Sequence, residues 1–296
     1  METKPLVSIC MITYGHEKFI EQAINGVLMQ QCNFEIELII SNDCSPDATN
    51  TLIETILKTH PKANCINYIN HTTNIGMMPN FIFALKKCTG KYIALCEGDD
   101  YWTDPLKLQK QFDFLEANED YVLCFHKVLF QMPSNELVED FLTIVPNEYE
   151  NLKNLAENGN YIHTPSVFYR NCLTNYPNEF AISPIGDYFL YTMLANFGKL
   201  KYLKEQMAVY RYGVGFYSGF DGSIKSKKWI KTLLLIVSSS NNELINEILI
   251  NKIIKSFKLD EFEVNSKITK LSKIKNFTIQ FVPPIFFTLK NKIFKK

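Results

Sequence analysis

The chain has 296 residues, a length that suggests one large or two small domains at roughly 150 residues per domain. Hydrophobic residues make up 46% and charged residues 21%, so general disorder is excluded. The 31 basic and 31 acidic residues balance, but eight Lys and no acid fall within 264–296. The rest of the chain therefore has an acidic excess of eight charges, which disfavours general nucleic-acid binding.

The first part of the chain alternates between expected strands and expected helices. Strands are expected at residues 6–13, 35–41, 65–69 and 92–96. Helices are expected at residues 17–31, 78–88 and 106–118, and after Ser45, which is predicted to cap a helix with Pro46 at its first position. This order is typical of a mostly parallel sheet with helices on both faces. Because ligands of such sheets bind beyond the carboxyl ends of the strands, the polar residues that follow each strand are candidate site residues.

The second part of the chain has a mixed pattern. Strands are expected at 121–131, at 166–170 and, as one or two strands, at 200–212, with a helix at 187–197 that ends at Gly198. From about residue 223 the pattern is helical, and an apolar stripe runs through residues 244–257. This part therefore adds strands and helices to the α/β unit.

The cysteine pattern and the start of the chain bear on location. The eight cysteines show no C-x-x-C spacing, which disfavours zinc-ribbon and redox motifs and predicts free, reduced thiols. No apolar run reaches the roughly 18 residues of a spanning helix, and the polar start leads into a run too short for a signal peptide. We therefore expect a cytoplasmic protein.

Three acids stand in the turn after the fourth expected strand. Glu97, Asp99 and Asp100 lie within four residues, and so many carboxylates after a buried strand are costly unless a cation or polar ligand compensates them. Hard oxygen ligands of this kind suit Mg²⁺ or Mn²⁺. The alternative is a solvated acidic turn that caps the helix beginning near Pro105.

Four segments occur in order within the first 115 residues, namely VSICMITYGHEKFIEQAINGVLMQQ, ELIISNDCSPDAT, NIGMMPNF and CTGKYIALCEGDDYW. Together they resemble the family 2 inverting glycosyltransferases, which use nucleotide sugars on a GT-A (Rossmann-like) fold. The resemblance continues more thinly to about residue 215 through TPSVFYR, IGDYFLY and MAVYRYG. It implies a glycosyltransferase domain over 1–220, with a nucleotide-sugar half at 1–115 and an acceptor half at 116–220, then C-terminal helices at 221–262 and a basic aromatic tail at 263–296.

The resemblance assigns the nucleotide side of the site. Thr13 and Tyr14 match positions that line the base pocket, and Asp43 matches the acid that accepts the N3–H of uracil in a charge-assisted bond. Asp99 matches a residue near the ribose, and Asp100 matches the ligand of a Mn²⁺ or Mg²⁺ ion that bridges the phosphates. Asp99 and Asp100 are both expected to belong to the metal site. For Asp43 the alternative role is in the turn before the next helix.

The resemblance also assigns the catalytic base. Asp187 in the segment IGDYFLY matches the carboxylate that takes the proton from the acceptor hydroxyl during inverting transfer. Its alternative role is to cap the helix that begins there. Glu97 stands where an Asp is more usual, and its longer side chain leaves its contact with the ligand open.

Three further residues are expected to contact the acceptor or the phosphates, namely Trp102, Arg170 and Arg211, the last two being the only arginines in the chain. Many relatives carry a histidine two residues after the position of Arg211, where this chain has Gly213. Any contact of that histidine is therefore either missing here or supplied by another residue, such as Tyr212 or Tyr217. His126 is expected in the core, whereas functional roles stay open for His16 and His163.

Several other functions have no support in the sequence. A nicotinamide dehydrogenase would need G-x-G-x-x-G after the first strand, and a P-loop kinase would need G-x-x-x-x-G-K-[ST]. The expected activity is transfer of a hexose or N-acetylhexosamine from a UDP-sugar to a hydroxyl of a glycan or lipid-linked oligosaccharide of a bacterial surface polysaccharide. The alternatives are a non-catalytic nucleotide-sugar-binding protein and a UDP-sugar hydrolase.

The tail at 264–296 combines eight Lys with five Phe. This mixture suits the headgroup boundary of an anionic membrane and predicts peripheral contact with its inner face. Packing of the tail on the catalytic domain or on a partner is the alternative.

Overall fold

The structure is a computed structural model, and it describes residues 5–215 and 222–256. The basic tail and Tyr217 lie outside these residues. Within the described part, no helix is long and apolar enough to cross a membrane. All eight cysteines are free, as expected from their spacing. The division of the chain at residue 220 stays a prediction.

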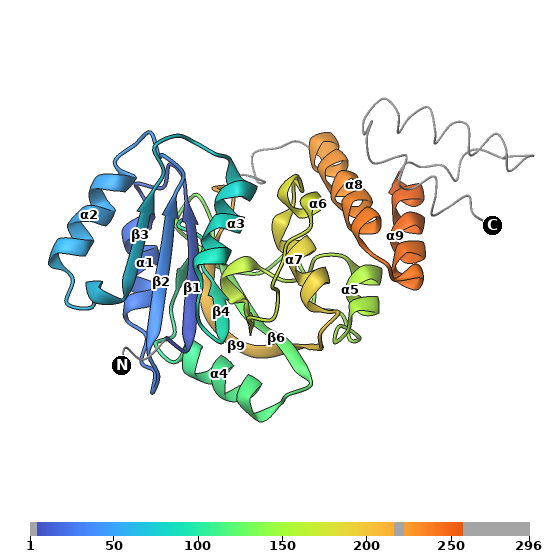
Figure 1. Ribbon diagram of the computed structural model, residues 1–296, viewed down its shortest axis with the longest axis horizontal. Coiled ribbons are helices and arrows are strands. Elements are labelled where there is room, and N and C mark those ends of the chain that lie inside the picture. Colours follow the sequence, from blue (N-terminus) through green and yellow to red (C-terminus); the bar gives the residue numbers. More distant parts are fainter. Residues whose placement is uncertain (1–4, 216–221, 257–296) are drawn as a thin grey trace, which may run out of the picture.

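A single mixed sheet forms the centre of the molecule (Figure 1). Its strands are β1 (Val7–Thr13), β2 (Ile36–Asn42), β3 (Ile66–Asn70), β4 (Tyr92–Leu95), β5 (Tyr101–Trp102), β6 (Tyr121–Gln131), β7 (Leu137–Glu139), β8 (Phe168–Arg170) and β9 (Lys199–Arg211). They are arranged in the order β3-β2-β1-β4-β8-β6-β9-β5, with β7 beside β6. β3, β2, β1 and β4 are parallel, β8 is antiparallel to both of its neighbours, and β6 and β9 are parallel. The expected mostly parallel GT-A sheet is therefore present.

The helices cover both faces of this sheet. They are α1 (Ile20–Leu28), α2 (Thr49–Thr59), α3 (Met77–Lys87), α4 (Lys107–Ala117), α5 (Leu152–Asn158), α6 (Asn178–Ala181), α7 (Gly186–Leu194), α8 (Gly222–Ser239) and α9 (Glu243–Ser256), with short 3₁₀ turns at Ala63–Cys65 and Thr164–Ser166. α1, α2 and α4 share one buried apolar cluster with the sheet. α3, α5, α7, α8 and α9 share the other, and Figure 1 shows α5 to α9 gathered on the right of the sheet.

Strand β1 shows why the sheet is buried on both faces. Val7, Ile9 and Met11 contribute to the cluster under α1 and α2, whereas Cys10 contributes to the cluster under α3. Side chains alternate between the two faces of a strand, so a continuously apolar segment such as VSICMIT can fill both layers. Close packing continues at Gly26, where a Cβ atom would lie 2.9 Å from the backbone nitrogen of Trp102. Only glycine lets α1 approach β5 this closely.

The structure corrects several expected boundaries. The helix expected to start after Ser45 starts at Thr49 instead, because the Ser45 hydroxyl donates to Asn42 Oδ1 and stays in the preceding loop. The region 200–212 is one long strand, β9, whose pairing with β6 is interrupted by bulges. The short elements β5, β7, α5 and α6 were not expected from the pattern.

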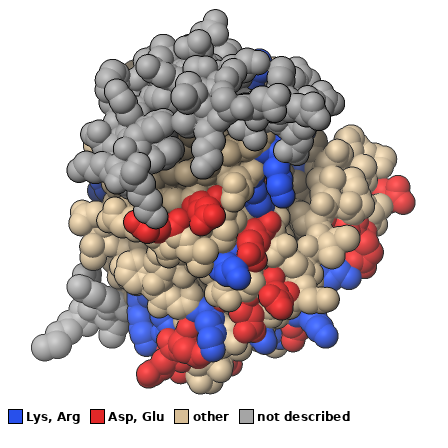
Figure 2. All heavy atoms as spheres, turned by 90° about the vertical axis from the view of Figure 1, so that its right-hand side faces the viewer, with Lys and Arg blue, Asp and Glu red and all other residues tan. Residues whose placement is uncertain are grey.

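Charges of both signs are interspersed on the face seen from the right-hand side of Figure 1. Figure 2 shows blue and red side chains alternating over the lower part of this face, rather than a broad patch of one sign. Nucleic-acid binding by electrostatics alone needs a continuous basic surface, and this part of the described face does not offer one.

Candidate active site

The carboxyl ends of the central parallel strands meet at one edge of the sheet. Thr13, the last residue of β1, pairs in register with Asn42, the last residue of β2. β4 lies on the other side of β1 and leads into the acidic turn, whose Gly98 N–H donates to the carbonyl of Ile12 at 3.0 Å. The sheet therefore brings the loops that follow β1, β2 and β4 together.

The acidic turn forms a cluster of carboxylates. One oxygen each of Glu97, Asp99 and Asp100 lies within 4.8 Å of the others. Burial raises the pKa of Glu97 to about 8, and the negative charges of Asp99 and Asp187 add to this rise. Burial also raises the pKa of Asp100 well above its usual range, with repulsion from Asp99 and Glu97 as further causes. The cluster therefore holds more negative charge than its own surroundings neutralise.

The donor set fits a hard divalent cation. One oxygen of Asp100, Oδ1, accepts the backbone N–H of Arg211 at 2.8 Å, but Asp100 Oδ2 is buried without a hydrogen-bond partner in the described part of the chain. A buried carboxylate oxygen without a partner is costly, and a bound cation would satisfy it. Three carboxylates within ligand distance of one another provide the oxygen ligands that Mg²⁺ and Mn²⁺ prefer.

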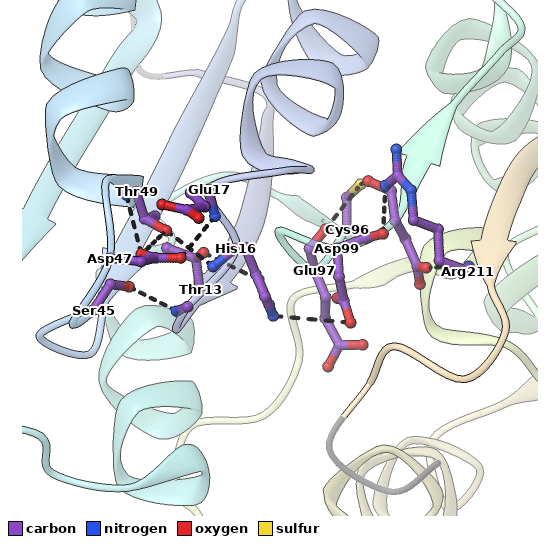
Figure 3. A network of polar contacts seen from close by, with 12 residues as sticks. Thr13, His16, Glu17, Ser45, Asp47, Thr49, Cys96, Glu97, Asp99 and Arg211 are labelled. Atoms are coloured by element: carbon purple, nitrogen blue, oxygen red, sulfur yellow. Dashed lines mark hydrogen bonds and ion pairs between the residues drawn. The ribbon is translucent and has the colours of Figure 1, made fainter. Parts of the chain in front are cut away.

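A hydrogen-bonded clasp holds the loop after β1 against the loop after β2 (Figure 3). The backbone N–H of Gly15 donates to Ser45 Oγ at 3.0 Å, that of His16 donates to Thr49 Oγ1 at 2.9 Å, and that of Glu17 donates to an oxygen of Asp47 at 3.0 Å. These bonds fix the backbone that carries Thr13, which is buried, and Tyr14, whose side chain is 49% exposed.

His16 connects this clasp to the acidic turn. Its Nδ1 lies 3.1 Å from Thr13 Oγ1, and its Nε2 lies 3.9 Å from Asp99 Oδ2. Figure 3 shows the ring pointing across the gap between the two loops. Gly98 makes this approach possible, because a Cβ atom there would lie 2.7 Å from Thr13 Oγ1 and 2.9 Å from His16 Nδ1.

Asp43 is buried at the base of the same edge. Its Oδ1 accepts the N–H of Ile75 at 2.7 Å, and its Oδ2 accepts the N–H of Gly76 at 2.9 Å. The carboxylate therefore anchors the loop between β3 and α3 in addition to any contact with a base. Each oxygen has a second lone pair, so these two bonds still leave acceptor capacity on Asp43.

Asp187 lies in the first turn of α7. The N-cap of this helix is Ile185, so the alternative role of Asp187 as its N-cap is wrong. Its Oδ1 accepts the N–H of Tyr188 at 2.7 Å, and its Oδ2 accepts from Asn160 Nδ2 at 2.9 Å. Burial raises the pKa of Asp187, and the two donated hydrogen bonds oppose this rise.

One pocket of about 570 Å³ extends from the acidic turn to α7. It is lined by Glu97 and Asp187, by Met78 and Phe81 of α3, and by residues of the acceptor half and of α8 and α9. Glu97 of the acidic turn and Asp187 of α7 thus face the same space. This is the arrangement that transfer between a donor and an acceptor would require.

The structure corrects the expected roles of Trp102 and Arg170. The Trp102 side chain is buried, and its Nε1 donates to the carbonyl of Pro165 at 2.9 Å, so it does not line the pocket. Arg170 pairs with Tyr92 at the end of β4 opposite to the acidic turn. There its guanidinium donates to backbone carbonyls near the C-terminus of α4, including Asn118 O at 3.2 Å. Both residues support the fold rather than the site.

Arg211 does reach the site, although its guanidinium is already engaged. It donates to the backbone carbonyl of Asp99 and to Gln22 Oε1, and it lies over the rings of Phe19 and Tyr101. Its side chain therefore stabilises the acidic turn through the backbone of Asp99. A contact of Arg211 with a phosphate stays a prediction. Tyr212, a candidate replacement for the missing histidine, packs instead against Phe130 and Phe141.

Two contributors were not assigned from the sequence. Asn160 holds the proposed base, but an Asn in a loop carries no signal without the fold. Glu97 was left open, yet it belongs to the carboxylate cluster and lines the pocket.

His163 also lines the pocket, where its Nε2 lies 2.7 Å from Asp140 Oδ2. His126 is a buried core residue, as expected.

Residues 8–176 match the profile of the family described as Glycosyl transferase family 2. The uncharacterized protein Mb1547 of Mycobacterium bovis is 36% identical over 205 residues, which are 69% of this chain and 58% of that protein. The chain therefore matches less than two thirds of the length of this curated relative. The putative teichuronic acid biosynthesis glycosyltransferase TuaG of Bacillus subtilis is 31% identical over 38% of this chain and 42% of its own.

Solved structures share the fold. S. aureus TarS 1-349 in complex with UDP-GlcNAc aligns with a TM-score of 0.61 and 19% identity, over 84% of this chain and 72% of TarS. The mannosyltransferase PcManGT from Pyrobaculum calidifontis, in complex with GDP-Man and Mn²⁺, aligns with a TM-score of 0.55 and 12% identity, over all of this chain and 89% of its own. With the family match over residues 8–176 and a sheet of GT-A type, the chain belongs to glycosyl transferase family 2.

Proposed function

We propose that the protein is an inverting glycosyltransferase that moves a hexose or N-acetylhexosamine from a UDP-sugar to a hydroxyl group of a glycan or lipid-linked oligosaccharide. The observation that carries this proposal is one pocket lined both by Glu97, a member of the carboxylate cluster after β4, and by Asp187 of α7. A nucleotide-binding protein without transfer activity would have no use for a second acid on the acceptor side of that pocket.

Asp187 is the proposed general base. Inverting transfer requires a carboxylate that takes the proton of the acceptor hydroxyl while its oxygen attacks the anomeric carbon. Asn160 and the Tyr188 N–H hold the carboxylate in a fixed orientation, and burial raises its pKa towards the range in which a base works best near neutral pH. A fixed base of raised pKa is what this step needs.

The carboxylate cluster is the proposed cation site. Asp99 and Asp100, with Glu97 beside them, would hold Mn²⁺ or Mg²⁺, and the bound cation would neutralise the charge that develops on the departing diphosphate. The backbone N–H of Arg211 fixes one Asp100 oxygen and leaves the other for the cation. The Mn²⁺ bound to the structurally similar mannosyltransferase supports this proposal.

The loops after β1 and β2 are the proposed base pocket. Asp43 would accept the N3–H of uracil, while Thr13 and Tyr14 line the pocket. The clasp between these loops holds them in place before a nucleotide arrives, which reduces the entropy that binding has to offset. The UDP and UDP-GlcNAc bound to TarS support the choice of a uridine donor. The putative teichuronic acid biosynthesis glycosyltransferase TuaG supports a glycan acceptor. We further propose that this acceptor belongs to bacterial surface polysaccharide synthesis and is reached at the inner face of the membrane.

A two-stage experiment tests the proposal. Thermal shift with a panel of UDP-, dTDP- and GDP-sugars and Mn²⁺ identifies the donor, and we expect stabilisation by UDP-sugars. UDP release is then measured with that donor in the presence and absence of glycan acceptors. Acceptor-dependent release supports transfer, acceptor-independent release indicates a hydrolase, and binding without release indicates a binding protein.

A further inference from the structure

A further part of the pocket wall, here called its second end, belongs neither to the acidic turn nor to α7. It is formed by Trp229 of α8 and Lys252 of α9. Both residues lie beyond residue 176, where the family match ends. The features of this wall therefore belong to this chain's own C-terminal helices rather than to the shared family segment.

A short loop connects this wall to the proposed base. Gly159 has a left-handed φ of +82°, and a Cβ atom on it would lie 3.5 Å from Trp229 Cζ2 and 3.6 Å from Lys252 Nζ. The next residue, Asn160, donates to Asp187. Because consecutive Cα atoms lie about 3.8 Å apart, Trp229 and Lys252 border the same short stretch of backbone that orients the base.

Lys252 places a positive charge at this end of the pocket. Within residues 5–215 and 222–256 it has no ion pair, and the nearby Glu157 lies 3.7 Å from Lys153 instead. Burial lowers the pKa of Lys252, with Glu157 opposing the shift. Among the described lining residues, Lys252 is the one Lys or Arg, whereas Glu97 and Asp187 are the acids. An anion at this end would compensate a partly desolvated ammonium.

Trp229 provides an aromatic surface beside that charge. Its ring centroid lies 4.7 Å from that of Tyr188 at an interplanar angle of 48°, which fixes the indole against α7. Its ring edge borders Gly159, where the absence of a side chain keeps the space open. A large, fixed aromatic side chain in a pocket offers apolar contact area to a flat ligand face, such as the C–H face of a pyranose.

We propose that this end of the pocket binds an acidic sugar of the acceptor glycan, with its ring against Trp229 and its carboxylate or phosphate group at Lys252. The inference rests on the proposed function, because it assigns the acceptor to the side of Asp187 that faces away from the nucleotide. It predicts that the enzyme prefers anionic acceptors to neutral ones of the same size.

Three probe ligands test this subsite without requiring turnover. Methyl glucoside, methyl glucuronide and glucose 6-phosphate are titrated by NMR into the full chain, with and without UDP and Mn²⁺. We expect the anionic probes to bind about three- to tenfold more tightly than methyl glucoside. Lys252→Met should remove this preference, whereas Trp229→Leu should weaken the binding of all three probes.

Lys255→Met is the matched control, since Lys255 lies one turn further along α9 and is exposed. It should keep the preference, and thermal melts should show that both Lys variants are folded. Equal affinity of the wild type for neutral and anionic probes would overturn the inference, and so would a preference that survives Lys252→Met. UDP titration of the same proteins separates the two claims, because absence of UDP binding would refute the proposed function and leave the probe result valid.

Discussion

Asp187 is held by two hydrogen bonds from Asn160 and the Tyr188 N–H, and no cation or Arg contacts it within the described residues. A substitution that keeps its shape but removes its charge separates its structural role from its chemical one. We expect Asp187→Asn to lower the transfer rate by about 10²–10⁴, the range typical of a lost general base, with little change in melting temperature. UDP release with acceptor measures the rate. Near-normal turnover with unchanged donor affinity would place the base elsewhere.

Asn160 is one of two groups that donate a hydrogen bond to the carboxylate of this base. Its donated hydrogen bond favours the charged carboxylate and lowers a pKa that burial raises. Replacing it in Asn160→Ala should therefore raise the pKa of Asp187 further. Because the base acts when deprotonated, turnover rises with pH through this pKa, and the acidic limb of the rate profile should move to higher pH in the variant. A profile of log kcat against pH measures the shift. An acidic limb at the same pH in the variant and the wild type would show that Asn160 does not affect the pKa of the base.

Asp43 has both a structural and a proposed recognition role. Asp43→Ala should weaken UDP binding by about 1.5–3 kcal/mol, the usual effect of losing a charge-assisted bond. The variant should also lose stability, because the N–H groups of Ile75 and Gly76 lose their acceptor. Calorimetric titration with UDP tests the first effect, and thermal melts test the second. A variant that melts early but binds UDP normally would show that Asp43 acts only as a loop anchor.

At the scale of single residues, the sequence predicted the acids better than the arginines. Glu97, Asp99 and Asp100 lie within four consecutive residues, so the turn after one strand suffices to bring them together. Arg170 illustrates the opposite case. A position in a strand does not indicate at which end of the sheet a long side chain acts, and the antiparallel pairing of β8 with β4 places Arg170 far from the acidic turn.

Helix α4 carries a buried lysine that bears on stability. Lys107 is fully buried, its Nζ donates to Gln111 Oε1 at 2.6 Å, and it lies 4.0 Å from the centroid of the Trp102 ring. Burial lowers the pKa of Lys107 to about 7. Between about pH 7 and the usual lysine range, the unfolded chain binds a proton that the folded chain does not. The free energy of unfolding should therefore rise with pH in this window, by up to about 1.4 kcal/mol per pH unit from this group.

Lys107→Met tests this contribution. The free energy of unfolding of the variant should lack the rise with pH that Lys107 contributes. The variant should therefore be stabilised relative to the wild type most strongly at the low-pH end of the window. Urea titrations at several pH values between 7 and 9.5 measure the difference. Lys110→Met serves as the control, because Lys110 forms an exposed pair with Asp104. Parallel pH dependences of the Lys107 variant and wild type would contradict a shifted pKa.

Among the elements, long periodic segments were predicted well and short ones were not. β6 has the expected bounds, and α4 differs by one residue at each end. β5, β7 and α6 have two to four residues each, too few for a periodic pattern, and they form only because neighbouring strands or helices pair with them. The late start of α2 reflects the bond from the Ser45 hydroxyl to Asn42 together with bonds from Gly15 and His16, about thirty positions earlier. No helical pattern reveals these loop bonds.

At the scale of the whole molecule, the sheet joins two halves that face one pocket. β1, β2 and β4 present the loops that carry Asp43 and the acidic turn at one edge, while α7 to α9 pack on one face and contribute a wall of the pocket. The alternation of strands and helices in the first half was predicted from the sequence. The second half depends on contacts between α7, α8 and α9, which lie mostly beyond the matched residues and could not be placed from sequence.

The dependence of transfer on a divalent cation tests the central claim most directly. UDP release from the identified donor, in the presence of acceptor, is measured with Mn²⁺, after chelation with EDTA, and after Mn²⁺ is restored. We expect chelation to abolish turnover and Mn²⁺ to restore it in the wild type, whereas Asp100→Ala stays inactive throughout while retaining residual metal-free UDP binding. Turnover that is insensitive to EDTA, or full activity of Asp100→Ala, would contradict the claim that the carboxylate cluster after β4 holds a catalytic cation.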